Sequence, residues 1–83
     1  MPDASTDAKA AARLVEFMAK AIVEKPDEVR VTVTGDDGDI LELEAAGDDR
    51  GRVIGRQGRV AKAMRAVVEA SSVGSGCRLE IID

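Results

Sequence analysis

The chain has 83 residues and a formal net charge of −4, with no His, Trp or Tyr, one Phe and one Cys. This length predicts one small domain, and 45% apolar with 34% charged residues is typical of a soluble globular protein. A single Cys excludes an internal disulfide framework, and no Cys/His cluster is available for a structural zinc. No apolar run approaches the roughly 20 residues that cross a bilayer, so we expect no membrane insertion and a cytoplasmic location.

The charge is distributed unevenly. The window from Arg50 to Arg65 holds six cations and no acid, while the other 67 residues hold six cations and all 16 acids. The window therefore carries +6 and the remainder −10. The net charge argues against a polyanion partner, and the missing aromatics argue against modules that stack bases on rings. If the chain binds an anion, we expect it to bind within this window.

The first predicted element is a helix that follows a flexible tail. Residues 1–7 are assigned to the tail, and a helical period runs from Ala8 to about Glu24, where Pro26 ends it. Its apolar stripe is predicted to comprise Ala11, Leu14, Val15, Met18 and Ile22. Phe17 and Met18 are expected in the core or on a dimer surface.

Two strands and a turn come next. Residues 29–34 alternate valines with polar side chains, and residues 40–45 place Leu41 and Leu43 on one face, so both segments are predicted to be half-buried strands. The glycine-rich segment 35–38 between them has the composition of a hairpin turn.

The second half is predicted to contain two helices and a strand. Asp48 or Asp49 is expected to cap a short helix that reaches about Ile54. A second helix is predicted over residues 59–70, followed by a flexible loop over 71–76 and a strand over 77–82. The apolar stripe of the second helix comprises Val60, Ala63, Met64, Val67 and Val68. The order α-β-β-α-α-β indicates an α+β fold, with three helices packed on one three-stranded sheet.

A G-x-x-G segment, Gly55-Arg56-Gln57-Gly58, joins the last two predicted helices. Glycine permits positive φ and close approach of another backbone. The segment also lies at the amino end of a helix, where free N–H groups favour an anion, and Arg56 and Arg59 add donors suited to phosphate. The spacing alone is a weak signal, because residues 35–38 repeat it with two acids in the middle. That acidic copy is interpreted as a turn only.

The residues from Val53 to Arg65 read V-I-G-R-Q-G-R-V-A-K-A-M-R. They resemble the signature V-I-G-x-x-G-x-x-I of the KH (K-homology) RNA-binding domain, with Val60 in place of the commoner Ile. The predicted order of elements is similar to the type II, bacterial arrangement. Length and flanking sequence resemble the KhpA family of stand-alone bacterial KH proteins, and the resemblance covers residues 8–83 as a single KH domain.

The resemblance implies a protein that binds about four nucleotides of single-stranded RNA, or of DNA, with residues 55–58 clamping the backbone. It also implies that Ser71–Gly76 and Cys77–Ile82 form the opposite wall of the groove. The family further implies a homodimer or a heterodimer with a larger KH-containing protein. It implies a role as a post-transcriptional regulator or RNA chaperone, linked to cell envelope and division.

The expected RNA-binding residues combine the loop with its neighbours. They are Val53, Ile54, Gly55, Arg56, Gln57, Gly58, Arg59 and Lys62. Val53 and Ile54 are expected to offer apolar surface to a base, whereas Lys62 is equally consistent with a solvated helix face. The remaining cations of the window, Arg50, Arg52 and Arg65, are expected to form salt bridges or a diffuse field. The alternative function is a KH-fold dimerisation adaptor with weak or lost RNA binding.

Neither catalysis nor metal binding is expected. The chain has no His, Cys77 has no base partner and is expected in the core, and the basic glycine segment fits neither a P-loop nor a dinucleotide-binding motif. The acids at 36, 37 and 39 lack the spacing of a calcium loop. We therefore expect no enzymatic activity, no cofactor and no metal.

Overall fold

The fold is seen in a computed structural model that describes residues 4–74 and 76–82. Its main elements are α1 (Ala4–Ile22), β1 (Arg30–Thr34), β2 (Ile40–Glu44), α2 (Arg50–Ile54), α3 (Arg59–Ala70) and β3 (Arg78–Ile81). Single 3-10 turns lie at Pro26–Glu28, Gly47–Asp49 and Arg56–Gly58. In the described residues the order of helices and strands confirms the predicted α+β arrangement, and the range of α3 is the predicted one.

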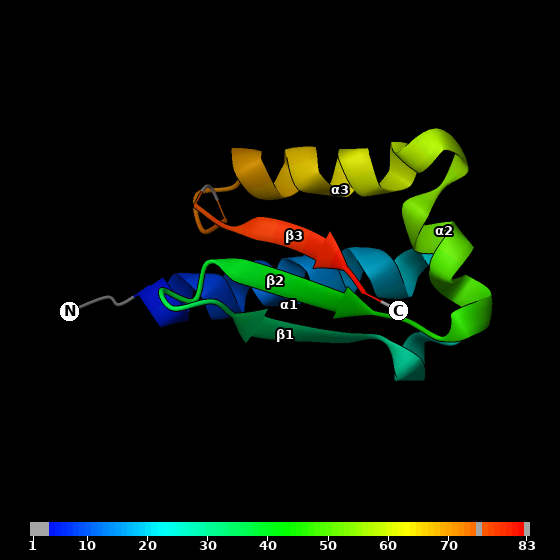
Figure 1. The fold of residues 1–83 in the computed structure, drawn as a ribbon, viewed down its shortest axis with the longest axis horizontal. Helices are drawn as coiled ribbons and strands as arrows, with labels where there is room; N and C mark the ends of the chain where they lie inside the picture. Colours follow the sequence, from blue (N-terminus) through cyan, green and yellow to red (C-terminus); the bar gives the residue numbers. More distant parts are fainter. Residues whose placement is uncertain (1–3, 75, 83) are drawn as a thin grey trace.

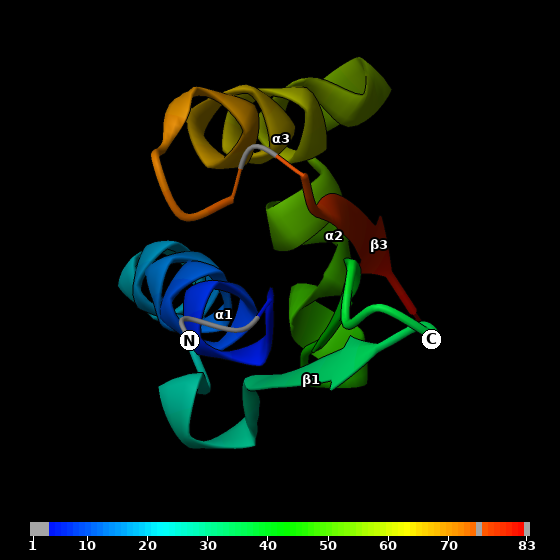
Figure 2. The ribbon, with the colours of Figure 1, turned by 90° about the vertical axis from the view of Figure 1, so that its left-hand side faces the viewer.

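The three strands form one sheet with β2 in the centre (Figure 1). β1 pairs with β2 in antiparallel fashion, Val31 opposite Leu43, and β3 pairs with β2 in parallel, with Leu79 beside Leu41. A parallel pair needs a crossover connection, and here that connection consists of α2, the Gly55–Gly58 loop and α3. Figure 2 shows α1 and α3 on the same side of the sheet, with α3 next to β3.

The first helix begins and ends earlier than predicted. It starts at Ala4, so residues 4–7, which were expected in a flexible tail, are helical, while residues 1–3 of that tail lie outside the described part of the chain. It ends at Ile22, four residues before Pro26. No described helix is long and apolar enough to cross a membrane.

The loop after α3 starts with a tight turn. The Ser71 hydroxyl donates to the Val68 carbonyl at 2.7 Å and accepts from the Gly74 N–H at 2.9 Å. The beginning of the predicted flexible loop is therefore held by side-chain hydrogen bonds, and Ser75 lies outside the described residues.

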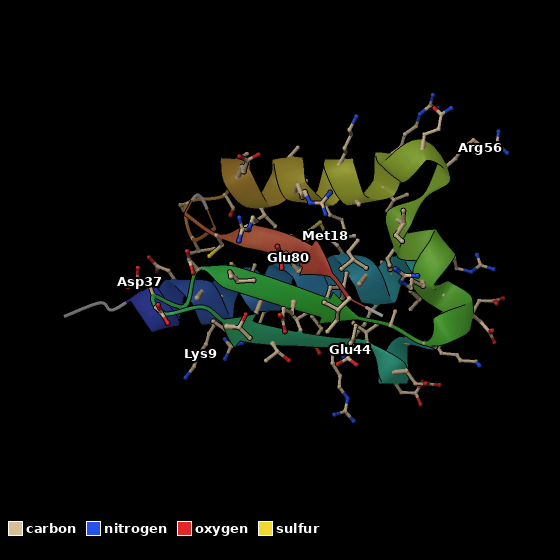
Figure 3. The ribbon with its side chains drawn as sticks, in the orientation of Figure 1. Lys9, Met18, Asp37, Glu44, Arg56 and Glu80 are labelled. Atoms are coloured by element: carbon tan, nitrogen blue, oxygen red, sulfur yellow. The ribbon has the colours of Figure 1, made fainter. Side chains whose placement is uncertain are left out.

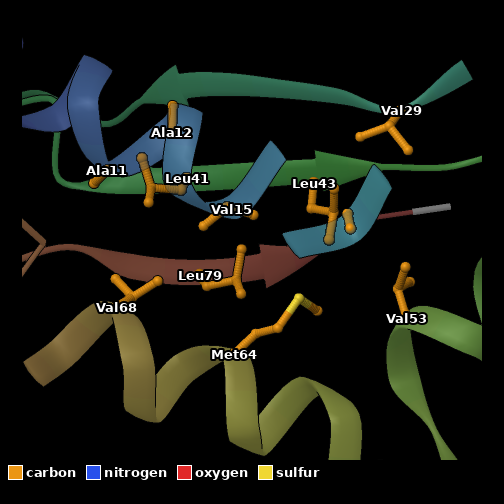
Figure 4. Close-up of a cluster of buried hydrophobic side chains, with 11 residues drawn as sticks. Ala11, Ala12, Val15, Val29, Leu41, Leu43, Val53, Met64, Val68 and Leu79 are labelled. Atoms are coloured by element: carbon orange, nitrogen blue, oxygen red, sulfur yellow. The ribbon is translucent and has the colours of Figure 1, made fainter. Parts of the chain in front are cut away.

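Small side chains on α1 form its buried side. The residues with at most 9% exposure are Ala8, Ala11, Ala12, Val15 and Ala19. Of the predicted stripe, Ala11 and Val15 are buried, whereas Leu14 and Met18 are only half-buried and Ile22 is 40% exposed. Alanines let the helix lie close to the sheet, where tight packing favours small groups. Figure 4 shows the other elements that pack against this face, through Leu41, Leu43, Val53, Met64, Val68 and Leu79.

Asp49 ties the segment after α1 to the start of α2. Its side chain is 1% exposed, and its carboxylate accepts hydrogen bonds from the backbone N–H groups of Glu24 at 3.0 Å and Lys25 at 2.9 Å. The Arg52 Nε lies 3.4 Å from Asp49 Oδ1. No side chain caps α2, so the expected capping role of Asp48 or Asp49 was wrong. Asp49 instead joins two segments that are far apart in the sequence.

We predict that Asp49→Asn loses stability in a pH-dependent manner. The N–H of Glu24 is the largest factor that lowers the pKa of Asp49 below its ordinary value of 3.8. A lowered folded-state pKa contributes stability that is complete above the unfolded-state pKa and is lost as the pH falls through the folded-state pKa. The stability gap between wild type and variant, measured by urea unfolding, is therefore expected to be largest near neutral pH and to shrink below about pH 4. A gap that stays constant down to acid pH contradicts this role.

Candidate nucleic-acid interface

The Gly55–Gly58 loop is a single tight turn between α2 and α3. The Gly55 N–H donates to the Gly51 carbonyl at 2.8 Å, which ends α2, and the Gly58 N–H donates to the Gly55 carbonyl at 3.0 Å. Gly55, Gln57 and Gly58 have φ of 78°, 58° and 75°. Three left-handed residues out of four turn the backbone sharply, so that the middle of the loop faces solvent.

The two glycines are required for different reasons. A Cβ built on Gly55 lies 2.8 Å from the backbone nitrogen of Val60, and within 2.9 Å of two of its side-chain carbons. A Cβ on Gly58 meets nothing within 4 Å. Gly55 therefore allows a close approach of loop and helix, whereas Gly58 is needed only for its left-handed backbone.

We predict that Gly55→Ala destabilises the fold more than Gly58→Ala. At Gly58 the cost is the left-handed conformation alone, about 1–2 kcal/mol. At Gly55 the new Cβ also clashes with the Val60 backbone nitrogen, and only a movement of α3 can relieve this clash. Urea unfolding of both variants measures the difference, and equal losses contradict the close approach.

The side chains in the middle of the loop point away from the body of the molecule, as Figure 3 shows for Arg56. Arg56, Gln57 and Arg59 are exposed, and Arg59 Nη2 donates to Gln57 Oε1 at 3.2 Å. Within the described residues, the side chains of Arg56 and Lys62 make no hydrogen bond or ion pair. No side chain caps the amino end of α3. The loop thus presents free guanidinium donors beside a helix end that favours an anion.

The two aliphatic residues before the loop differ in position. Val53 is fully buried and belongs to the core cluster. Its side chain anchors α2 and leaves no surface for a base, which corrects the expectation that Val53 borders the ligand. Ile54 is half-buried and keeps part of its side chain exposed.

A groove separates α3 from the edge strand β3. Arg65 Nε donates to the Leu79 carbonyl at 3.1 Å. On one side of Arg65 lies a cavity of about 510 Å³, lined by Arg78, Leu79, Glu80, Ile81 and Ile82. On the other lies one of about 270 Å³, lined by Val68, Glu69, Cys77, Arg78 and Leu79. The strand thus faces α3 across the groove, as the resemblance implies, and sequence reasoning did not identify Arg65 as part of it.

The loop that follows α3 does not line these two cavities. Ser72, Val73 and Gly76 contribute instead to a cavity of about 370 Å³, which shares Cys77 with the smaller of the two. The acids on that cavity are Asp7, Asp37 and Asp39. This surface has the wrong charge for phosphate.

Arg52 is engaged by acids, as expected. Its Nη2 lies 3.4 Å from Glu24 Oε1 and its Nε 3.4 Å from Asp49 Oδ1. It helps to hold the start of α2 and is not directed at the loop.

Cys77 is half-buried and packs against the core cluster. Burial is the largest factor that raises the pKa of its thiol above 9.0, and the charges of Asp39 and Asp7 add to it. The thiol therefore stays protonated at neutral pH, which agrees with a packing role. No group of His, Cys, Asp or Glu in the described residues could hold a metal ion.

A three-stranded sheet covered on one side by helices, two of which are joined by a basic G-x-x-G turn, defines a KH-type domain. The family model described as "KhpA/KhpB, KH domain" matches residues 12–82, so the chain belongs to this family. The family is not one of enzymes, as the sequence predicts.

Several relatives match most of the chain, and each bears the name RNA-binding protein KhpA. The relative from Clostridium acetobutylicum is 49% identical over 70 residues, which cover 83% of this chain and 93% of its own. That from Halalkalibacterium halodurans is 50% identical over 74 residues, 84% and 96% of the two chains. That from Streptomyces coelicolor is 43% identical over 70 residues, 83% and 87%. No solved structure gives a significant match.

Proposed function

We propose that this chain binds single-stranded RNA, about four nucleotides at a time, through the Gly55–Gly58 loop. The observation that carries the proposal is the exposed, basic middle of the loop, where the Arg56 side chain has no partner within the described residues. The relatives named as RNA-binding proteins support the same choice of ligand. A small RNA-binding domain of this kind suits a post-transcriptional regulator or RNA chaperone in the cytoplasm.

In the proposed mechanism, one part of the site binds the RNA backbone and another part binds the bases. Arg56, Arg59 and the backbone N–H groups of residues 56 and 57 hold phosphates by charge-assisted hydrogen bonds, and Lys62 adds charge one turn further along α3. The bases lie toward Ile54 and the groove between α3 and β3. Because the chain has no Trp or Tyr and one Phe, the bases are held by aliphatic surface and hydrogen bonds and not by ring stacking.

We predict that Arg56→Asp combined with Gln57→Asp weakens RNA binding by at least about tenfold. Asp tolerates the left-handed conformation of residue 57, so thermal stability and oligomeric state should not change. Fluorescence anisotropy with a labelled single-stranded RNA measures the affinity. RNA binding that survives the double change refutes the clamp.

A matched control is available in the acidic G-x-x-G segment. Asp36→Asn with Asp37→Asn also changes the charge of such a turn, but this turn lies at the opposite end of the molecule from Arg56 (Figure 3), and affinity should change little. With two or three phosphates neutralised at about 0.7 per phosphate, log Kd should rise with log salt with a slope of roughly 1.4 to 2.1. An affinity that does not depend on salt favours the alternative function.

That alternative, dimerisation, is favoured by an apolar groove between α1 and α3. The groove has a volume of about 460 Å³, and its lining includes Phe17, Met18, Val60, Ala63 and Val67. Phe17 is 74% exposed and Val67 44%. Phe17, which was expected in the core or on a dimer surface, is therefore not in the core, and a second copy of the chain or a larger KH partner would remove this apolar area from water.

We predict that Val67→Glu converts a dimer to monomer, because each copy then places a carboxylate in an apolar contact. Ala66→Glu is the matched control, since Ala66 is exposed on the same helix but does not line the groove. Sedimentation equilibrium distinguishes the two variants. If both remain dimeric, or wild type is monomeric at high concentration, this face is not the interface.

A further inference from the structure

Arg65 bridges the groove between α3 and β3. Its Nε donates to the Leu79 carbonyl at 3.1 Å, and the residue lines both cavities of the groove. The side chain therefore lies between the two cavities and forms part of the surface of each.

The backbone of β3 explains why this carbonyl is available. The Arg78 N–H donates to the Asp39 carbonyl at 2.7 Å and the Ile82 N–H to the Leu43 carbonyl at 2.9 Å, so these two residues face β2. In a parallel strand, alternate residues direct their polar groups to opposite edges, which points the Leu79 carbonyl away from β2 and toward α3. Arg65 satisfies it with one donor.

This hydrogen bond positions the guanidinium group of Arg65 but uses only one of its N–H donors. Arginine has five N–H donors in a planar fork and no acceptor, so the Nη donors remain for a ligand in the groove. Arg65 also continues the line of cations that starts at the loop, since Arg59, Lys62 and Arg65 are neighbours three residues apart on the helix surface. At 1.5 Å per residue it lies about 9 Å along α3 from Arg59, within the reach of a short RNA held at the loop.

We infer that Arg65 determines base specificity, favouring bases that present two adjacent acceptors. This inference rests on the proposed RNA binding. Guanine offers O6 and N7, and cytosine offers O2 and N3. In uracil a donor N–H separates the two carbonyls, and in adenine the acceptors flank an amino donor, so the guanidinium fork meets only one acceptor on either base. A groove with Arg65 held in place selects cytosine and guanine over uracil and adenine.

The test uses short oligouridine probes in which two adjacent central bases are replaced by cytosine, guanine or adenine. Wild type is expected to bind the cytosine and guanine probes about tenfold more tightly than the others in fluorescence anisotropy. Arg65→Lys keeps the charge but removes the fork. It should reduce the preference to less than about twofold while the salt dependence stays that of wild type.

Lys62→Gln provides the opposite change on the same helix. It removes a charge without touching the β3 groove, so it should weaken binding to all probes by one common factor and leave the preference intact. A preference that Arg65→Lys retains, or that wild type never shows, overturns the inference. If Arg65 only fastens α3 to β3, Arg65→Lys lowers the unfolding midpoint and leaves the preference unchanged, which also overturns it.

The two proposals fail in different ways. If the loop variant Arg56→Asp/Gln57→Asp abolishes binding and Arg65→Lys does not alter the preference, RNA binding at the loop stands and the role of Arg65 falls. If Arg65→Lys removes the preference and the loop variant binds normally, base selection by Arg65 stands and the loop clamp falls. A wild-type chain that binds none of the probes overturns both.

Discussion

The contact between Gly55 and Val60 is the constraint on which the site depends. Because a Cβ at Gly55 would lie 2.8 Å from the Val60 backbone nitrogen, the loop passes against α3 with no side chain between them. Both flanking helices are anchored independently, α2 through Val53 and α3 through Met64 and Val68, which all reach the same core. With both ends fixed and the loop lying against α3 at Gly55, residues 56 and 57 project outward and are exposed to solvent. The exposure of the basic residue is thus a consequence of packing on either side of it.

The acidic G-x-x-G segment shows what this constraint adds. Both segments are closed by the same bond between glycines, at 3.1 Å in residues 35–38 and 3.0 Å in residues 55–58, and all four glycines have positive φ. The two turns differ at their centre, because Gln57 has a positive φ and neither Asp36 nor Asp37 does, but they share the spacing of the glycines and the closing bond. The spacing of the glycines therefore carries no function by itself. One segment also joins strands and carries two Asp, while the other joins helices and carries Arg56 in the turn before α3. Charge and setting distinguish a phosphate-binding candidate from a hairpin turn.

Much of the fold was predictable because each element has its own local signal. The alternation in β1 and β2, the period of α3 and the glycines of the loop are properties of short segments, and all three were found where expected. What could not be predicted depends on partners distant in the sequence. Periodicity shows that α1 has a wide apolar face but not that the sheet accepts its alanines and leaves Phe17 outside. In the same way an Asp before a helix resembles a cap, and only the fold brings the N–H groups of residues 24 and 25 to the carboxylate of Asp49.

The six cations of the basic window also have roles that the sequence does not distinguish, because these roles depend on distant partners. Arg52 is held by Glu24 and Asp49, and Arg65 is fastened to β3. Arg50 is the first residue of α2, and Arg56, Arg59 and Lys62 lie exposed at the loop and in the first turns of α3. Of the window's charge of +6, the part placed to bind phosphate is therefore this short line of three cations. The net charge of −10 on the other residues repels a polyanion from the rest of the surface. A protein arranged in this way holds a short strand in one orientation with little nonspecific affinity, which leaves discrimination between sequences to the groove beside that line.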